Sequence, residues 1–135
     1  MGSRLIFIDT SVVIAILVSE DDAVELSEAM EAAQYRATSA LVILEATMRL
    51  STLLSLQPAQ VSVIIDAFLD RGQIEIVPIE AADRSFAVEA FARYGKGQRH
   101  PARLNLADCL SYACAKRRGL TLLYKGGDFA LTDLA

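Results

Sequence analysis

Four acidic residues stand where their side chains could act together on a substrate: Asp9, Glu45, Asp108 and Asp128. Carboxylates that lie within a few ångströms of one another repel, and they need cations to stay ionised. Oxygen ligands of this kind suit Mg²⁺ or Mn²⁺, which can activate a water for attack on a phosphodiester bond. If the four acids converge, the sequence predicts metal-dependent phosphodiester hydrolysis with Mg²⁺ or Mn²⁺ as cofactor.

Each acid also has an ordinary structural explanation. Asp9 lies between the apolar run 5–8 and a predicted helix, so it could cap that helix, although Thr10 or Ser11 could serve as the cap instead. Asp108 could be a favourable first-turn acid behind Asn105, the expected cap of its helix. For these two positions the residues alone leave both explanations open.

The other two acids differ in how easily they are explained. Asp128 could be a turn residue after the last predicted strand. Glu45 is surrounded by apolar residues in the segment 41–54, and a glutamate pushed towards a core needs a partner or a metal. Arg49, one helical turn later, offers an ordinary surface ion pair as the alternative.

The elements that must position these acids alternate along the chain, and we take residues 1–135 as a single domain, with Gly2 and Ser3 set aside as possible cloning remnants. Short apolar segments between helices predict an α/β fold with a mostly parallel sheet, in which ligands bind beyond the carboxyl ends of the strands. Strands are expected at 5–8, 35–39, 74–79 and 120–124. Helices are expected at 12–19, 41–54, 58–70, 81–94 and 106–118, and a further one is opened by residues 19–22 and runs to about 33.

Charge is distributed unevenly. Residues 1–92 carry a net charge of −9, whereas residues 93–135 carry +5. The loop around 93–105 holds Lys96, Arg99 and Arg103, which we expect to hold a phosphate backbone outside the acidic site. The alternative is a solvated face with cations at helix ends. His100 is the one histidine of the chain, which suits a reaction without a histidine base.

Two further features bear on the compartment. Cys109 and Cys114 are five residues apart on one predicted helix, so they face different directions and are expected to stay unpaired in a reducing environment. The longest apolar run, 12–18, is too short to span a membrane, and the N-terminus lacks the features of a signal peptide. A cytoplasmic location without a membrane partner is the expectation.

Three stretches carry a resemblance to a known family: "FIDTSVVIAIL", "SALVILEATMRL" and the long C-terminal stretch from "RYGKGQRHPARLNLADCL" to "KGGDFALTDL". They resemble the PIN-domain ribonucleases, specifically the VapC toxins of bacterial toxin–antitoxin pairs. The resemblance implies that Asp9, Glu45 and Asp108 are metal ligands and catalytic acids, with Ser11 and Asn105 as supporting polar residues.

The end of the chain departs from the family pattern. Gly126 and Gly127 stand where many relatives carry an acid or an amide. Asp128 is therefore the least secure fourth catalytic and metal-binding residue, and one tightly held ion is expected rather than two.

The resemblance also implies the fold and the partners. The fold would be PIN-like with three layers, a mostly parallel central sheet of four to five short strands flanked by helices. The activity would be endonucleolytic cleavage of RNA. A VapB-type antitoxin would inhibit it by laying its C-terminal segment, often with an arginine, across the acidic site. A homodimer and a toxin–antitoxin hetero-oligomer are expected, with DNA contacted only through the antitoxin.

Other classes of protein fit less well. Haloacid-dehalogenase-like phosphatases need a second aspartate where this chain has Ser11. Receiver domains need an acidic pair near the first strand and a phospho-acceptor at the end of a middle strand, and neither is visible. A PIN-fold binding or regulatory module with little nuclease activity remains as the alternative.

Overall fold

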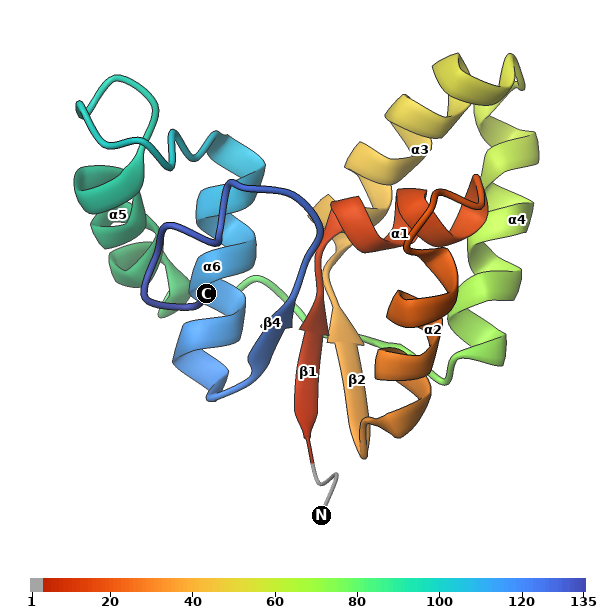
Figure 1. Cartoon of the computed structure of the whole chain (residues 1–135), viewed down its shortest axis with the longest axis horizontal. Helices are drawn as coiled ribbons and strands as arrows, with labels where there is room; N and C mark the ends of the chain where they lie inside the picture. Colours follow the sequence, from red (N-terminus) through yellow and green to blue (C-terminus); the bar gives the residue numbers. More distant parts are fainter. Residues whose placement is uncertain (1–3) are drawn as a thin grey trace.

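The computed structural model describes residues 4–135, which form a parallel sheet flanked by helices (Figure 1). The strands are β1 (Leu5–Ile8), β2 (Tyr35–Thr38), β3 (Glu75–Ile76) and β4 (Thr121–Leu123). The helices are α1 (Thr10–Leu17), α2 (Ala23–Ala32), α3 (Ala40–Leu54), α4 (Pro58–Arg71), α5 (Asp83–Tyr94) and α6 (Leu106–Arg118).

The strand order is β3-β2-β1-β4, and every neighbouring pair is parallel. The chain steps from β1 to β2 to β3 in one direction and then returns to the other side of β1. Right-handed crossovers in opposite directions place the connecting helices on opposite faces of a sheet. Figure 1 shows this result, with α1–α4 on one side and α5–α6 on the other. The prediction of a three-layer α/β fold with a mostly parallel sheet is confirmed.

The central strand β1 is the core of the molecule. Ile6, Phe7 and Ile8 are each no more than 3% exposed. Both faces of β1 are covered by helices, which is why this strand reads as a continuous apolar run rather than an alternating one. Each such side chain contributes roughly 1.5–3 kcal/mol relative to an exposed position.

The first helix begins earlier than the sequence suggested. We expected it at 12–19 with Thr10 or Ser11 as the cap, but α1 starts at Thr10 and its cap is Asp9. Asp9 is extended (φ −79°, ψ 160°), and its carboxylate accepts a hydrogen bond from the Ser11 backbone N–H at 3.1 Å. The alternative in which Thr10 or Ser11 caps the helix, so that Asp9 need not do so, is therefore wrong.

The third strand is shorter than expected, with two residues instead of 74–79. It lies at the edge of the sheet, and Pro78 has no N–H to continue the ladder beyond Val77, whose amide makes the last bond to Thr38. The next helix begins at Asp83 rather than 81, because the Asp83 carboxylate accepts a hydrogen bond from the Glu80 amide and stabilises the turn before it.

Two other expectations concern the cysteines and the membrane. Cys109 and Cys114 are both buried and unpaired, as predicted. Within the described residues, no helix alone has the length and apolar composition to cross a bilayer. The bent pair α3 and α4, with 120° between them, passes the test of length and composition only when the two are taken together.

Candidate metal centre

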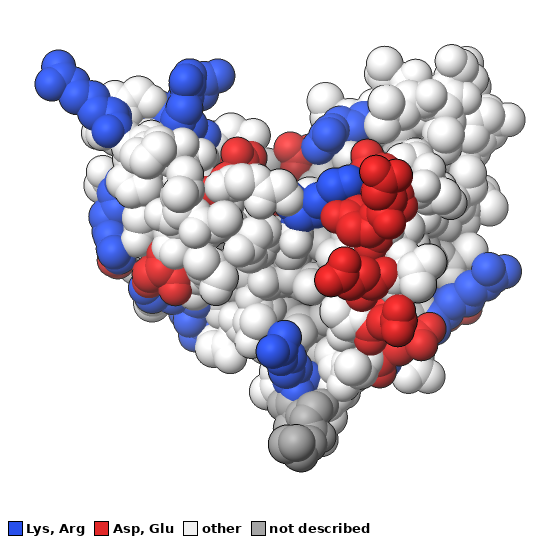
Figure 2. Space-filling model, in the orientation of Figure 1, with Lys and Arg blue, Asp and Glu red and all other residues white. Residues whose placement is uncertain are grey.

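The candidate site lies at the carboxyl ends of β1 and β4. The chain leaves β1 towards one face of the sheet and reaches β4 from the other, so the strand order reverses between these two strands. Such a reversal leaves a crevice at the carboxyl end of a parallel sheet, where ligands bind. Figure 2 shows a notch between the two helical halves, with acidic surface near its base.

Asp9 enters this crevice directly from β1. Its side chain is 5% exposed, and the Ser11 hydroxyl donates to its Oδ2 at 2.7 Å. Together with the bond from the Ser11 amide, this contact fixes one carboxylate oxygen. The extended backbone of Asp9 thus orients its side chain, and helix α1 holds Ser11 in place to bind it.

Asp108 enters from the first turn of α6 and is 8% exposed. Asn105 caps this helix, as predicted, because its Oδ1 accepts from the Asp108 amide at 2.9 Å. In return, the backbone N–H of Asn105 donates to Asp108 Oδ2 at 3.1 Å. This reciprocal capping box holds the Asp108 carboxylate at the helix N-terminus.

Glu45 and Asp128 are less constrained. Glu45 lies half-buried on α3, and Asp128 is exposed in the segment that follows β4. The surface ion pair between Glu45 and Arg49 that served as the alternative explanation does not form among the described residues.

The four acids nevertheless act on one another. Burial raises the pKa of Asp108 to about 7, and the charges of Asp9, Asp128 and Glu45 add to this effect against the lowering by the Asn105 amide. Burial also raises the pKa of Asp9, with a further contribution from Glu45, although the hydrogen bonds from Ser11 oppose it. Side chains from four separate segments therefore share one electrostatic environment.

This environment carries negative charge without a compensating cation. In residues 4–135 no Lys or Arg forms an ion pair with any of the four acids. Within the same residues, no three Asp, Glu, His or Cys side chains lie close enough together to form a complete metal site. Carboxylate oxygens around uncompensated charge fit Mg²⁺ or Mn²⁺, with water in the remaining positions.

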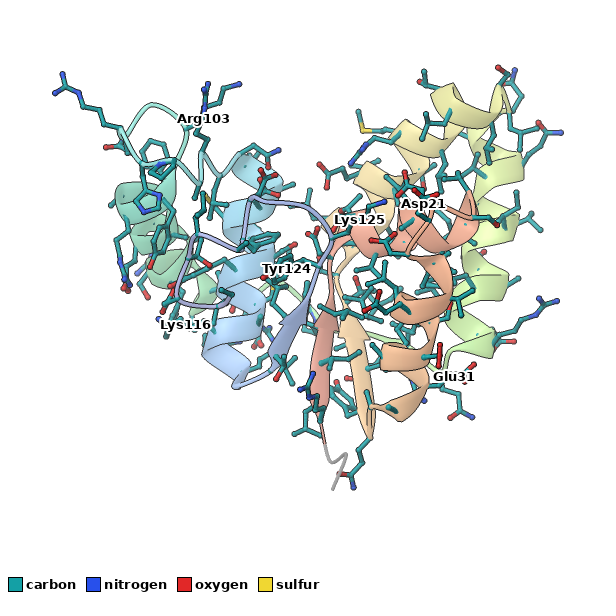
Figure 3. The ribbon with its side chains drawn as sticks, in the orientation of Figure 1. Asp21, Glu31, Arg103, Lys116, Tyr124 and Lys125 are labelled. Carbon is teal, nitrogen blue, oxygen red and sulfur yellow. The ribbon has the colours of Figure 1, made fainter. Side chains whose placement is uncertain are left out.

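Sequence reasoning missed Lys125, which ties the two strand ends together. Its backbone amide donates to Ser11 Oγ at 2.9 Å. Its ammonium lies 2.8 Å from Glu20 Oε1 and 3.1 Å from Asp22 Oδ1, and Figure 3 shows Lys125 close to Asp21 of the same acidic segment. Its position directly after the last apolar segment was the available signal, since parallel β4 and β1 end at the same edge.

The basic loop, residues 95–105 with Lys96, Arg99 and Arg103, connects α5 to α6 and ends at Asn105, the cap of α6. It is closed at its base by the Lys96 amide bonded to the Leu104 carbonyl at 2.9 Å and by the Leu104 amide bonded to Tyr94 at 2.8 Å. Lys96 lines a cavity of about 550 Å³ together with Asn105. Arg99 and Arg103 are exposed, and Figure 3 shows Arg103 at the upper end of the α5–α6 half.

Comparison with known proteins assigns this chain to a family. The PIN domain family profile matches residues 6–134. A VapC ribonuclease of Rhizobium meliloti (strain 1021) is 38% identical over 139 residues, covering 95% of this chain and 98% of the relative. Ribonuclease VapC28 of Mycobacterium tuberculosis is 38% identical over 127 residues, covering 94% and 93%. The chain therefore belongs to the PIN-domain family, within its VapC ribonucleases, and the resemblance noted in the sequence is confirmed.

Solved structures show the same fold. Mycobacterium tuberculosis VapC20, described as a sarcin–ricin loop cleaving toxin, superimposes with a TM-score of 0.69 at 19% identity, covering 93% of this chain and 92% of that one. A toxin–antitoxin complex from Klebsiella pneumoniae gives 0.66 at 20% identity, covering 96% and 93%.

Proposed function

We propose that this chain is a VapC-type toxin, an endoribonuclease that cleaves RNA phosphodiester bonds with Mg²⁺ or Mn²⁺ held by its carboxylates. The observation that carries the proposal is a pair of buried carboxyl groups between β1 and β4 that have no cationic partner. Asp9 and Asp108 are both almost fully buried there, without a paired Lys or Arg among the described residues. The VapC ribonucleases that match most of the chain give independent support.

The position of each residue in the site suggests its role. Asp9 and Asp108 hold the ion, because each is already oriented by its own helix cap. Glu45 and Asp128 complete the acidic surround, Asp128 less securely because it is exposed. With a divalent ion held by these carboxylates, the site would have the positive charge needed to activate a water and to stabilise the leaving oxygen. Ser11 and Asn105 fix the two buried carboxylates.

RNA would be held by the basic loop. Lys96, Arg99 and Arg103 are exposed cations on the loop that ends at Asn105, and Lys96 lines the same cavity as Asn105. Contacts of this kind position the phosphate backbone but carry no base preference. Binding of the RNA backbone by this loop would bring the scissile phosphate to the opening of the acidic site, while the neighbouring phosphates stay outside it.

A VapB-type antitoxin would inhibit the enzyme at the same acids. An arginine of such a partner could supply the missing positive charge and pair with two carboxylate oxygens. A groove of about 660 Å³ between α1, α2 and α4, with Ile16, Met30 and Phe68 in its walls, offers apolar contact for the rest of the partner. Any DNA contact of the complex would come from the antitoxin.

A homodimer is also proposed. Apolar side chains are exposed on α3 and α5, among them Met48 (63% exposed) and Val88 (66%). Exposed apolar surface of this kind marks interaction sites. Analytical ultracentrifugation of the chain and of Val88→Glu tests this, and a monomeric parent chain would contradict it.

The central experiment uses the purified chain freed of any partner. Total tRNA and rRNA are incubated with it in Mg²⁺, in Mn²⁺ and in EDTA, and new 5′ ends are sequenced. We expect metal-dependent cleavage by the parent chain and by Asp66→Asn, an exposed acid on α4. Asp9→Asn should not cleave, although it keeps a residue type that caps helices well.

The non-nuclease alternative predicts a different pattern. A PIN-fold binding module would show no cleavage with either metal, and Asp9→Asn would behave as the parent chain does. That result would overturn the proposed activity. Loss of the folded state in Asp9→Asn, detected by circular dichroism, would instead show that the Asp9 carboxylate is required for folding.

A further inference from the structure

The segment that carries Asp128 has no regular secondary structure of its own. Residues 124–135 follow β4 as turns and bends. A carboxylate on such a segment keeps its place only if contacts fix the backbone close to it, and beyond the Lys125 amide, which is bonded to Ser11 Oγ, two further points are fixed. One fixed point is Phe129, which is 2% exposed and packs its ring 5.6 Å from that of Tyr124.

The second fixed point is Asp133. The Tyr112 hydroxyl donates to its Oδ1 at 2.7 Å, and the Tyr94 hydroxyl lies 3.3 Å from the same oxygen. Lys116 forms an ion pair with the other oxygen, Oδ2. The Asp133 backbone amide also donates to the Tyr94 hydroxyl at 3.3 Å. Both the side chain and the main chain of Asp133 are thus attached to α5 and α6.

The two tyrosines that hold Asp133 are themselves buried. Tyr112 is fully buried and Tyr94 is 5% exposed, and their ring centroids lie 5.9 Å apart. Tyr112 and Lys116 stand one turn apart on α6, the same helix that presents Asp108 at its other end. A single rigid helix therefore carries one acid of the candidate site and holds the segment that carries another.

We propose that Asp133 is a positioning residue for Asp128: it binds Tyr112, Tyr94 and Lys116 and thereby holds the fourth carboxylate towards Asp108. The inference deepens the proposed function and rests on it for the role of Asp128. The Asp133 carboxylate is engaged by two hydroxyls and an ammonium, so it acts on the chain and does not ligate the ion. It is the last acid of the sequence, and its effect is exerted through the four residues that separate it from Asp128.

The first test measures whether the segment is anchored. Hydrogen exchange of the peptide 124–135 is followed by mass spectrometry in Asp133→Asn and Tyr112→Phe. Tyr112→Phe keeps the buried ring and the net charge and removes only the hydroxyl. Both variants should exchange about tenfold faster in this peptide, because local opening follows the loss of its attachments. Tyr35→Phe, which loses a hydroxyl bonded to Glu75 on the far edge of the sheet, is the control. Unchanged exchange in both variants overturns the anchor.

The second test measures coupling to Asp128 through Mn²⁺ affinity, determined by calorimetric titration. Groups that orient metal ligands change affinity by about 10–100-fold when removed, and we expect about tenfold for Asp133→Asn and for Tyr112→Phe. In an Asp128→Asn background neither should weaken binding further, since the carboxylate they position is gone.

The outcomes separate this inference from the proposed function. If Asp133→Asn weakens Mn²⁺ binding equally with and without Asp128, Asp133 does not act through Asp128 and the inference is wrong. If the parent chain binds no Mn²⁺ at all, the proposed function fails, whereas the exchange measurement still decides whether Asp133 anchors the segment.

Discussion

The Ser11 hydroxyl joins the two central strand ends: it donates to Asp9 Oδ2 at 2.7 Å and accepts from the Lys125 amide at 2.9 Å. Asp9 follows β1 and Lys125 follows β4. One small side chain therefore orients the buried acid and fixes the start of the segment that carries Asp128. Its position two residues after Asp9 makes both contacts possible from the first turn of α1.

Removal of this hydroxyl should affect both the site and the fold. Ser11→Ala leaves the Lys125 amide without its partner, and we expect it to lower the free energy of unfolding by about 1–2 kcal/mol. Mn²⁺ affinity should fall about tenfold because Asp9 loses an orienting contact. Chemical denaturation and titration calorimetry measure the two effects. Ser11→Thr keeps a hydroxyl and should retain most of both, and Ser62→Ala, on exposed α4 surface, should change neither. Equal behaviour of Ser11→Ala and Ser62→Ala would contradict the role.

The raised pKa of Asp108 makes the metal-free chain sensitive to pH. Its pKa of about 7 in the folded chain lies above the ordinary value of 3.8, so between these values the folded state binds a proton that the unfolded state has released. Stability in EDTA should therefore decrease as pH rises from 4 to 7, by up to about 1.4 kcal/mol per pH unit from this group, and then level off. Asp108→Asn should flatten this decrease. Thermal melts in EDTA from pH 4 to 8 measure it, and an identical pH profile for both proteins would refute it.

A buried ion-pair network holds α5 to the end of α6. Asp83 is fully buried, and Arg117 Nε lies 2.5 Å and Arg118 Nη1 2.9 Å from its Oδ1. Burial would raise the pKa of Asp83, but hydrogen bonds from Arg118, the Glu80 amide and Arg117 outweigh it and lower the pKa to about 2.

Asp83→Asn should destabilise the chain by about 3 kcal/mol at pH 7, because it leaves two guanidinium groups with a weaker partner. The stabilisation by Asp83 is complete above its unfolded pKa of 3.8 and is lost as pH falls through about 2. The parent chain should therefore lose more stability than Asp83→Asn between pH 4 and 2, in urea titrations at each pH. The exposed Asp66→Asn is the matched control. If the parent chain and Asp83→Asn lose the same free energy of unfolding between pH 4 and 2, Asp83 is not the source of the acid sensitivity.

The basic loop should determine the salt dependence of RNA binding. In the non-cleaving Asp9→Asn background, Lys96→Ala with Arg99→Ala should weaken binding and reduce the slope of log affinity against log salt by about 0.7 per lost phosphate contact. Arg4→Ala with Arg84→Ala removes two exposed cations elsewhere and should leave the slope unchanged. Fluorescence anisotropy with a labelled single-stranded RNA measures this, and equal slopes for the two double variants would exclude the loop.

Local signals in the sequence determined the elements and named the acids. A buried central strand has a continuous apolar sequence, and Asn105 caps the start of α6 as predicted. Gly119, which ends α6 in a left-handed conformation, is the residue type that favours such an end. The shortened β3 was also within reach, because Pro78 cannot donate to a ladder. The cap of α1 was not: Asp9, Thr10 and Ser11 are all suitable caps, and only the backbone conformation selects Asp9.

What the tertiary structure alone decided are the contacts between distant residues. The placement of β4 beside β1 brings Lys125 to Ser11 across 114 residues, and no local pattern encodes that neighbour. Asp83 lies in the first turn of α5, and only the packing of α6 brings two arginines to it. Asp133 became an anchor only where Tyr94 and Tyr112 meet. Sequence determines which groups a residue can bind, but burial and strand order determine which of those groups come within reach.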